Sequence, residues 1–545
     1  MIHRYILVLL MCFSLCWQQV DAQDDLIDTL LSSMTLEHKV AQLFMVSMYG
    51  ESLTYVGQEM LQTWQPGGVV LFPSNINTPA QITQLTNSYQ QTITEAGGIP
   101  LFIAVDQEGG WIARLRDGFT EWPPMSLLTA ANDPALAYDV GRAMALELRA
   151  VGINMNLAPV ADLDTNLDNP IIGRRSPGSE PELVSVMLQG YIAGSQEAGV
   201  MTTTKHFPGH GDTGEDSHVT LPVIYHDLTR LESMELRPFA AAIEAQTGAI
   251  MVAHIWFPAF DPEPLPASLS HNIVTGILRD TMGYDGLIIT DALDMDAIDT
   301  IYTDEEAALM AINAGVDMLV YSPGISEVRQ MAVMQFLVDA VRSGELDEAR
   351  IDDSVRRILH AKMRYGVMNW LPLEPDTVEE RIDLSGNLAL VERMFRAGVT
   401  VAFDHHDLLP IDAEQSVAII YPGQRISIQR VCGTYRDDIH WLSIPDSPSE
   451  ADIQAAERVA SLVDVVIVFT RNVDEHVNVP PLVRALPQQK TVAVALRSPY
   501  DLLAYPDVSG YIVTYGPQDP AITTTCGVLF GEYDALGTLA VDLDR

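Results

Sequence analysis

Short apolar runs alternate with longer amphipathic segments from about residue 24 to residue 366. Apolar runs bounded by polar or turn-forming residues are typical of buried strands, and amphipathic segments are typical of surface helices. The eight runs are residues 44–48, 68–72, 101–105, 154–159, 201–204, 250–254, 287–290 and 318–321. The amphipathic segments between them include residues 79–96, 134–150, 180–198 and 228–245.

This alternation predicts a parallel sheet with helices between its strands. Eight strand–helix units predict a (β/α)8 barrel of the TIM type, over residues 23–368. Periodicity alone also allows a doubly wound open sheet.

A second, smaller unit follows a proline-bearing linker, residues 369–385. Further apolar runs alternate with helical patterns such as residues 450–462, which predicts an α/β sandwich domain over residues 386–545. Its apolar runs are residues 399–403, 417–421, 465–469, 491–496 and 510–514.

The first 22 residues have the pattern of a signal peptide. His3 and Arg4 precede the apolar run 6–17, and small residues suitable for cleavage follow, ending at Ala22. This run is too short to span a bilayer, and no later stretch offers about 18 uninterrupted apolar residues. We therefore expect a secreted or periplasmic protein with no stable membrane insertion.

The four cysteines divide between this signal and the mature chain. Cys12 and Cys16 would leave with the signal. A lipid anchor on Cys16 is the less favoured alternative, because Leu15 before it is bulky. Cys432 and Cys526 remain, and in an exported chain they permit one disulfide without requiring it.

The net charge of −42, from 73 acidic and 31 basic residues, excludes some partners. It argues against nucleic acid and against anionic membranes as binding partners. The acids are dispersed along the chain, as on a solubilising surface. The charge does not determine the oligomeric state.

Residues 205–218, KHFPGHGDTGEDSH, combine three histidines, three acids and a lysine. Pro208 and several glycines exclude a regular helix or a continued strand, so we predict a loop, called here the polar loop. A zinc site on His206 and His210 is one alternative, although Pro208 and Gly209 forbid the helix that would bring the two together. A phosphate-binding loop lacks its required pattern. A solvated loop without function is a third possibility.

Charged groups also follow several other predicted strands. In a (β/α)8 barrel these strand ends share one rim, where catalytic groups lie. The groups are Asp106 and Glu108 after the third run, Asp162 with Arg174 and Arg175 after the fourth, Lys205 and His206 after the fifth, His254 after the sixth and Asp291 after the seventh.

Asp291 directly follows a fully apolar strand in GLIITDALDM. An alternative is that Asp291 caps the next helix, because aspartate is a favoured N-cap. Asp294, Asp296 and Asp299 suggest calcium, but the glycine that an EF-hand loop requires at its sixth position is missing.

KHFPGHGDT…DSH resembles the signature loop of family 3 glycoside hydrolases, in their β-N-acetylhexosaminidase branch. RSPYDL from Arg497 and GVLFGEYDALGTL from Gly527 resemble the C-terminal sandwich domain of that family. The resemblance implies a retaining mechanism with Asp291 as nucleophile. It also implies His218 as general acid/base, with Asp216 holding it.

The resemblance also implies a set of sugar-binding residues. Asp106 and Arg114 lie in DQEGGWIARL and Arg175 in IGRRS, and the Lys-His pair opens the polar loop. Trp111 stands where the family usually has arginine, so the preference for the leaving group stays open. The predicted substrate-binding residues are Asp106, Arg114, Arg175, Lys205 and His206.

We therefore expect an exported hydrolase that removes terminal β-linked N-acetylglucosamine from peptidoglycan fragments or chitin-type oligosaccharides by double displacement. The expected partner is this small carbohydrate substrate, and neither a metal ion nor an organic cofactor is implied. The alternatives are a β-glucosidase or an N-acetylglucosaminide phosphorylase of the same family, and a sugar-binding protein without activity. A pair of active-site candidates, Asp291 and His218, argues against the last.

Overall fold

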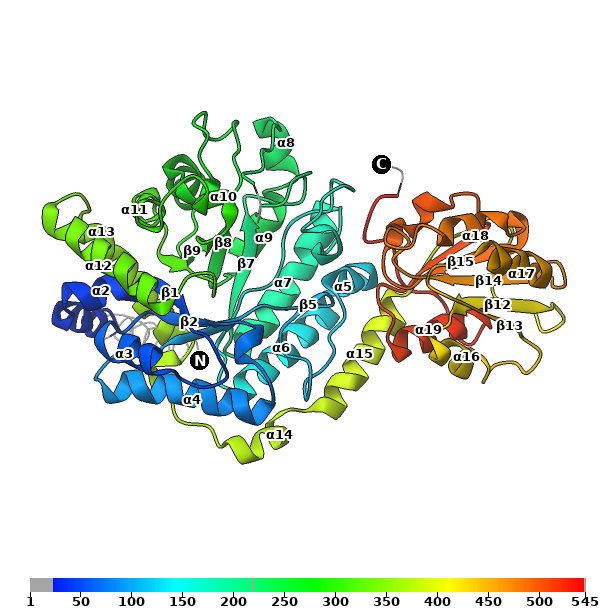
Figure 1. The fold of residues 1–545 in the computed structure, drawn as a ribbon, viewed down its shortest axis with the longest axis horizontal. Helices are drawn as coiled ribbons and strands as arrows, with labels where there is room; N and C mark the ends of the chain where they lie inside the picture. Colours follow the sequence, from blue (N-terminus) through cyan, green and yellow to red (C-terminus); the bar gives the residue numbers. More distant parts are fainter. Residues whose placement is uncertain (1–22, 218–219, 544–545) are drawn as a thin grey trace, which may run out of the picture.

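The computed structural model describes residues 23–217 and 220–543. Eight parallel strands close into a barrel in the order β1-β10-β9-β8-β7-β6-β3-β2 (Figure 1). The predicted (β/α)8 barrel is confirmed, and an open doubly wound sheet is excluded because β1 pairs with both β2 and β10. The strands are β1 (Phe44–Ser47), β2 (Gly68–Leu71), β3 (Phe102–Val105), β6 (Met155–Asn156), β7 (Met201–Phe207), β8 (Ala249–Val252), β9 (Leu287–Ala292) and β10 (Met318–Val320).

Helices on the outside of the barrel follow the amphipathic segments. The predicted helix 228–245 is wrong as a single element, because the backbone breaks at Met234 (φ −124°, ψ −81°) and Pro238 starts a new helix. The main helices are α2 (Leu36–Gln42), α3 (Tyr55–Thr63), α4 (Pro79–Glu95), α5 (Met125–Ala131), α6 (Pro134–Ala150), α7 (Pro181–Glu197), α8 (Leu228–Ser233), α9 (Arg237–Glu244), the π-helix η4 (Asn272–Thr281), α10 (Asp296–Asp299), α11 (Asp304–Ala314), α12 (Glu327–Ser343) and α13 (Glu348–Arg364).

Strand β7 continues farther than its apolar run predicts. Lys205, His206 and Phe207 belong to the strand, so the prediction that the polar loop begins at Lys205 is wrong for these three residues. Their polar groups are neutralised by partners inside the barrel, which lets a strand continue without apolar side chains.

The second domain is built on a six-stranded sheet in the order β11-β16-β15-β14-β12-β13, and β11 alone is antiparallel. Strand β13 was not predicted. It is an edge strand in which only Ile444 is fully buried, so it has no continuous apolar run. The strands are β11 (Thr400–Asp404), β12 (Val417–Pro422), β13 (His440–Ile444), β14 (Val465–Thr470), β15 (Thr491–Ala495) and β16 (Gly510–Val513).

Helices lie on both sides of this sheet, as the predicted α/β sandwich requires (Figure 1). In the view of Figure 1, α17 and α18 lie above the sheet and α16 and α19 below it. Their bounds are α16 (Ile426–Cys432), α17 (Glu450–Ala460), α18 (Val479–Ala485) and α19 (Asp519–Leu529).

Two chain segments join the domains. After α14 (Val378–Arg381), helix α15 (Leu384–Gly398) leads into the second sheet, and Asn387 on it donates a 3.0 Å hydrogen bond to Glu147 of the barrel. The C-terminal segment returns to the barrel, where Ala540 accepts a 3.0 Å bond from the Ser179 amide.

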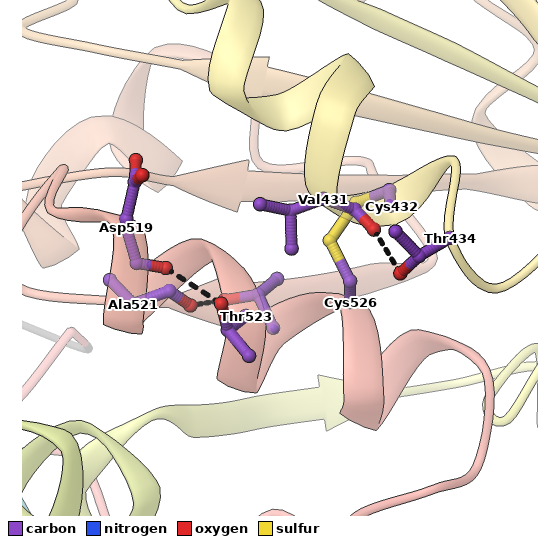
Figure 2. Close-up of a disulfide and its surroundings, with 8 residues drawn as sticks. Val431, Cys432, Thr434, Asp519, Ala521, Thr523 and Cys526 are labelled. Atoms are coloured by element: carbon purple, nitrogen blue, oxygen red, sulfur yellow. Dashed lines mark hydrogen bonds between the residues drawn. A yellow bond between two sulfur atoms is a disulfide. The ribbon is translucent and has the colours of Figure 1, made fainter.

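A disulfide joins Cys432 at the end of α16 to Cys526 in α19 (Figure 2). Both cysteines are fully buried, and 94 residues separate them in sequence. The structure thus settles a pairing that the sequence permitted but did not require.

Within residues 23–217 and 220–543, every helix is too short or too polar to cross a bilayer. The expected signal peptide, residues 1–22, lies outside the described residues.

Candidate active site

Lys205, on β7, connects its own strand at the C-terminal rim of the barrel to the end of β3. Its Nζ lies 2.7 Å from Asp106 Oδ1 and 2.8 Å from Glu108 Oε1. The side chain is only 2% exposed. Burial lowers the pKa of Lys205, but the two carboxylates outweigh it and raise this pKa above its usual value. The ammonium group therefore stays charged.

Glu108 is the shared partner of two cations. Arg175 donates to it through Nε at 3.0 Å and through Nη2 at 2.7 Å, a bidentate pair. Burial raises the pKa of Glu108, but Lys205 and Arg175 more than compensate and hold it well below its usual range. The sequence placed Glu108 at a strand end without a role. Its role is to balance the charges of the predicted sugar-binding residues.

Asp162 orients the ring of His206. Its Oδ2 lies 2.6 Å from His206 Nδ1, and its Oδ1 accepts from the amides of His206 at 3.1 Å and His210 at 2.7 Å. Arg175 Nη2 lies 3.4 Å from His206 Nε2, and an arginine only donates. Because a carboxylate only accepts, Nδ1 carries the proton that is donated to Asp162.

Asp291 lies near the end of β9, and α10 begins only at Asp296 with Met295 as its N-cap. The interpretation of Asp291 as a helix cap is therefore wrong. Its Oδ1 accepts a 2.8 Å hydrogen bond from the Ala292 amide. Burial raises the pKa of Asp291, but His206, His254 and the amide outweigh it and hold this pKa below its usual range. The carboxylate is ionised at neutral pH.

His254 contacts the backbone that directly follows Asp291. Its Nε2 donates to the Ala292 carbonyl at 3.0 Å, so its Nδ1 accepts from the Ser268 hydroxyl at 2.7 Å. Burial lowers the pKa of His254. A neutral ring fixed in one tautomer holds the backbone that carries Asp291.

The predicted acid/base His218 lies outside the described residues, but its neighbours are described. Asp216 is half-buried, and its carbonyl accepts a 3.0 Å bond from the Thr220 amide. Ser217 Oγ lies 2.8 Å from His210 Nε2, and the pKa of His210 is lowered to about 4 by burial. A neutral, buried His210 thus fixes the loop one residue before His218.

Gly211 shows why the polar loop contains glycine. A Cβ at this position would lie 1.6 Å from the Leu163 carbonyl oxygen, so only glycine allows the loop to approach this backbone. A Cβ at Gly214 would meet only the Asn166 side chain, at 3.8 Å. The loop is therefore packed tightly against the barrel backbone at Gly211 and has more room at Gly214.

A scan of protein families identifies residues 35–361 as the glycosyl hydrolase family 3 N-terminal domain. The chain belongs to glycosyl hydrolase family 3. It is 29% identical over 550 residues to beta-hexosaminidase A from Pseudoalteromonas piscicida, across 89% of this chain and 91% of that protein. Together with the barrel and its rim, this membership makes the protein a glycoside hydrolase.

Solved structures resemble this protein along nearly the whole chain. A family 3 beta-N-acetylglucosaminidase from Paenibacillus sp. str. FPU-7 is 34% identical with a TM-score of 0.82, covering 94% of this chain and 99% of that one. A beta-glucoside phosphorylase, BglX, is 25% identical with a TM-score of 0.81, covering 96% and 97%. Proteins named for different reactions therefore share this architecture.

In this family 3 protein the structure brings most of the predicted residues together. Lys205 contacts Asp106 directly, and His206 lies beside Arg175. Arg114 lies less tightly, with its Nη2 3.8 Å from Asp106 Oδ2 and its Nε buried without a partner among the described residues. The roles of these residues in binding stay predictions.

One group of described residues has metal-like geometry outside the rim. Ligand atoms of Asp212, His226 and Glu235 lie within 4.8 Å of one another. Arg230 Nη2 lies 3.1 Å from Glu235 and 3.7 Å from Asp212, so a guanidinium already pairs with both carboxylates. His226 hydrogen-bonds Asp212. The group ties the polar loop to α8.

Proposed function

We propose that the protein is an exported, retaining β-N-acetylhexosaminidase that releases terminal β-linked N-acetylglucosamine. The observation that carries this proposal is the ionised carboxylate of Asp291, which lies at the end of β9 on a rim of paired polar groups. The names of the relatives, beta-hexosaminidase and beta-N-acetylglucosaminidase, support this sugar specificity.

Asp291 would act as the nucleophile of a double displacement. The Ala292 amide occupies Oδ1, and no described residue donates to Oδ2, so Oδ2 is the oxygen that attacks the anomeric carbon. His218 would donate its proton to the leaving oxygen while a covalent bond to Asp291 forms. His218 would then take a proton from water, which releases the sugar with retained configuration. Asp216 would orient His218 and stabilise its protonated form.

The remaining rim groups would bind the sugar. Lys205 and Arg175 are already balanced by carboxylates, so they would recognise neutral hydroxyl and acetamido oxygens by donating hydrogen bonds without a net charge on the pocket. Asp106 would accept from hydroxyl groups. The ion pairs fix these side chains before substrate binds, which lowers the entropic cost of recognition.

Export is part of the proposal. Residues 1–22 have the signal-peptide pattern, and the disulfide between Cys432 and Cys526 is of the kind that forms in oxidising compartments. An extracytoplasmic enzyme of this type would meet peptidoglycan fragments or chitin-type oligosaccharides.

A phosphorylase is the second candidate, because the beta-glucoside phosphorylase shares the fold at 25% identity. A neutral histidine as acid/base repels phosphate less than a carboxylate would, so phosphate could replace water in the second step. Measuring sugar release with and without inorganic phosphate, and analysing for a sugar 1-phosphate, separates the two reactions.

The primary test compares p-nitrophenyl N-acetylglucosaminide with the matching glucoside. We expect a strong preference for the acetamido sugar, and comparable specificity constants would refute the proposal. A fluorinated, mechanism-based inactivator should label Asp291, and labelling elsewhere would refute the nucleophile.

External azide tests the acid/base. It should partly rescue His218→Ala by replacing the activated water, and it should give a glycosyl azide of β configuration. An α product would mean inversion and would exclude the proposed double displacement.

A further inference from the structure

Three arginines follow neighbouring strands of the second domain's sheet. Arg425 comes shortly after β12, Arg471 directly after β14 and Arg497 shortly after β15. These strands are parallel and adjacent, with β14 pairing to both β12 and β15. Their carboxyl ends therefore project all three arginines from one edge of the sheet. We call these three residues the arginine cluster.

This edge is where an open α/β sheet binds ligands. From β12 the chain first adds β13 on one side and then β14 on the other, giving the parallel order β13-β12-β14-β15-β16. Ligands of open α/β sheets bind outside the carboxyl ends of the strands at such a reversal. Here the reversal falls between β12 and β14, between the loops that carry Arg425 and Arg471.

The barrel faces this edge through Trp111. The guanidinium of Arg497 lies 5.6 Å from the centre of the Trp111 ring, and that of Arg174, from the barrel, lies 5.5 Å from it. Trp111 is 54% exposed. The tryptophan that replaces the family's usual arginine thus positions Arg497 at the boundary between the domains.

A cleft of about 1210 Å³ connects the two regions. Its lining includes Trp111, Arg174 and Arg497, and also Gly110 and Arg175 from the sugar-binding rim. Asp291 does not line it. Of the arginine cluster, only Arg497 lines the cleft. The cleft therefore extends from the edge of the sugar pocket to Arg497, and this is the space that a leaving group would occupy.

Part of the cluster's charge is not neutralised. Arg174 pairs with Asp474 and Glu475, and Arg471 lies 3.4 Å from Asp446. In contrast, the side chains of Arg425 and Arg497 make no hydrogen bond or ion pair with any described residue, although both are half-buried.

The cluster is also electrostatically strained. The buried Nε atoms of Arg425 and Arg471 have no acceptor among the described residues. Burial lowers the pKa of Arg497, and repulsion by Arg471, Arg425 and Arg174 lowers it further. Like charges gathered in a partly desolvated site are costly unless an anion compensates them. In a chain of net charge −42, such a cluster is not the product of a generally basic surface.

We propose that the arginine cluster, with Trp111, binds an oxyanion: a carboxylate or phosphate carried by the group on the leaving side of the scissile bond, or free phosphate. The first source makes the enzyme selective for acidic glycans. This proposal rests on the proposed glycosidase function, because only cleavage gives the cleft a leaving group to hold.

The test uses two matched substrates: N-acetylglucosamine β-linked to N-acetylmuramic acid, and the methyl ester of the same disaccharide. We expect kcat/KM to be about tenfold higher for the acid, as for one charge-assisted contact. Arg497→Gln and, independently, Arg425→Gln should bring the acid-to-ester ratio to about one. The ratio corrects for any loss of folded protein. Arg458→Gln, at an exposed position on α17, should leave the ratio unchanged.

Inorganic phosphate distinguishes the second source. If the wild type shows no preference for the acid, but phosphate accelerates release and yields N-acetylglucosamine 1-phosphate, the site holds free phosphate. A phosphate oxygen would then bond to the anomeric carbon as the bond to Asp291 breaks and its electron pair returns to the carboxylate. Arg497→Gln should abolish this acceleration.

Two results would overturn the proposal. One is a wild type with neither an acid preference nor a phosphate effect. The other is an effect that persists in both arginine variants. If the wild type cleaves neither disaccharide, the glycosidase function fails separately, and calorimetric binding of the acid disaccharide then decides. Binding lost in Arg497→Gln supports the anion site, and equal or absent binding refutes it.

Discussion

The barrel rim and the edge of the second sheet have a similar architecture, but their charges are paired differently. Both collect charged side chains at the carboxyl ends of parallel strands. On the rim, Lys205 and Arg175 are paired with buried carboxylates. At the sheet edge, Arg425 and Arg497 have no described counter-ion. The same topology thus presents a balanced surface suited to a neutral sugar and a cationic surface suited to an anion.

Removing the reacting group of the rim should have the largest effect. We expect Asp291→Asn to lower kcat at least about 10³-fold, because the nucleophile is lost while the shape is kept. Asp296→Asn, an exposed acid on α10, is the matched control and should stay within about twofold of the wild type. Steady-state kinetics with the p-nitrophenyl substrate checks both. A variant that retains more than roughly a tenth of native activity would contradict the assignment.

Glu108→Gln would make the rim resemble the sheet edge by leaving two cations without their shared carboxylate. We expect the free energy of unfolding to fall by about 3–5 kcal/mol, because Lys205 and Arg175 stay buried. KM should rise as these donors move. Denaturant unfolding measures the loss, and Glu95→Gln at the exposed end of α4 should change it by less than about 0.5 kcal/mol. An unchanged stability would mean that the pairing is not needed.

The disulfide should separate the stabilities of the two domains. Replacing Cys432 and Cys526 by alanine should lower the unfolding free energy of the second domain by about 2–4 kcal/mol, because the link closes a long loop. The barrel has no cysteine among its described residues and should be unaffected. Calorimetry should show one transition moving to lower temperature. Equal shifts of all transitions would mean that the domains unfold as one unit.

The smallest expected effect is the pH dependence of stability that Asp501, a carboxyl group beside the cleft, produces. Burial raises the pKa of its carboxyl to about 7. The folded state then binds more protons than the unfolded state between about pH 4 and 7, so stability should fall as pH rises through this window. From pH 5.5 to 6.5 the contribution is about 1.4 kcal/mol. Asp501→Asn should flatten this slope in urea unfolding, and an unaltered slope would show that Asp501 is not its source.

The protonation state of Asp501 also affects the charge of the cleft. Below about pH 7 Asp501 is largely protonated, so it does not neutralise the arginines that line the same cleft. It instead accepts hydrogen bonds from the Thr470 hydroxyl at 2.9 Å and from the Val473 amide at 3.4 Å.

Much of the fold could be predicted from the sequence because buried parallel strands are nearly continuous apolar runs. All eight barrel strands overlap the predicted runs. Edge strand β13 was missed, since its side chains are mostly exposed, and the end of β7 was missed, since Lys205 and His206 are polar. Predictions from periodicity fail where a strand has exposed side chains or where its buried side chains are polar.

The sequence by itself also determined which chemical groups stand near the strand ends, including Asp291, because these groups directly follow the apolar runs of the buried strands. Only the tertiary structure decided which of these groups meet. Glu108 balances Lys205 and Arg175, and Cys432 joins Cys526. The arginine cluster exists because β12, β14 and β15 are neighbours and their edge faces Trp111. Such contacts depend on strand order and domain packing, which no local pattern of residues encodes.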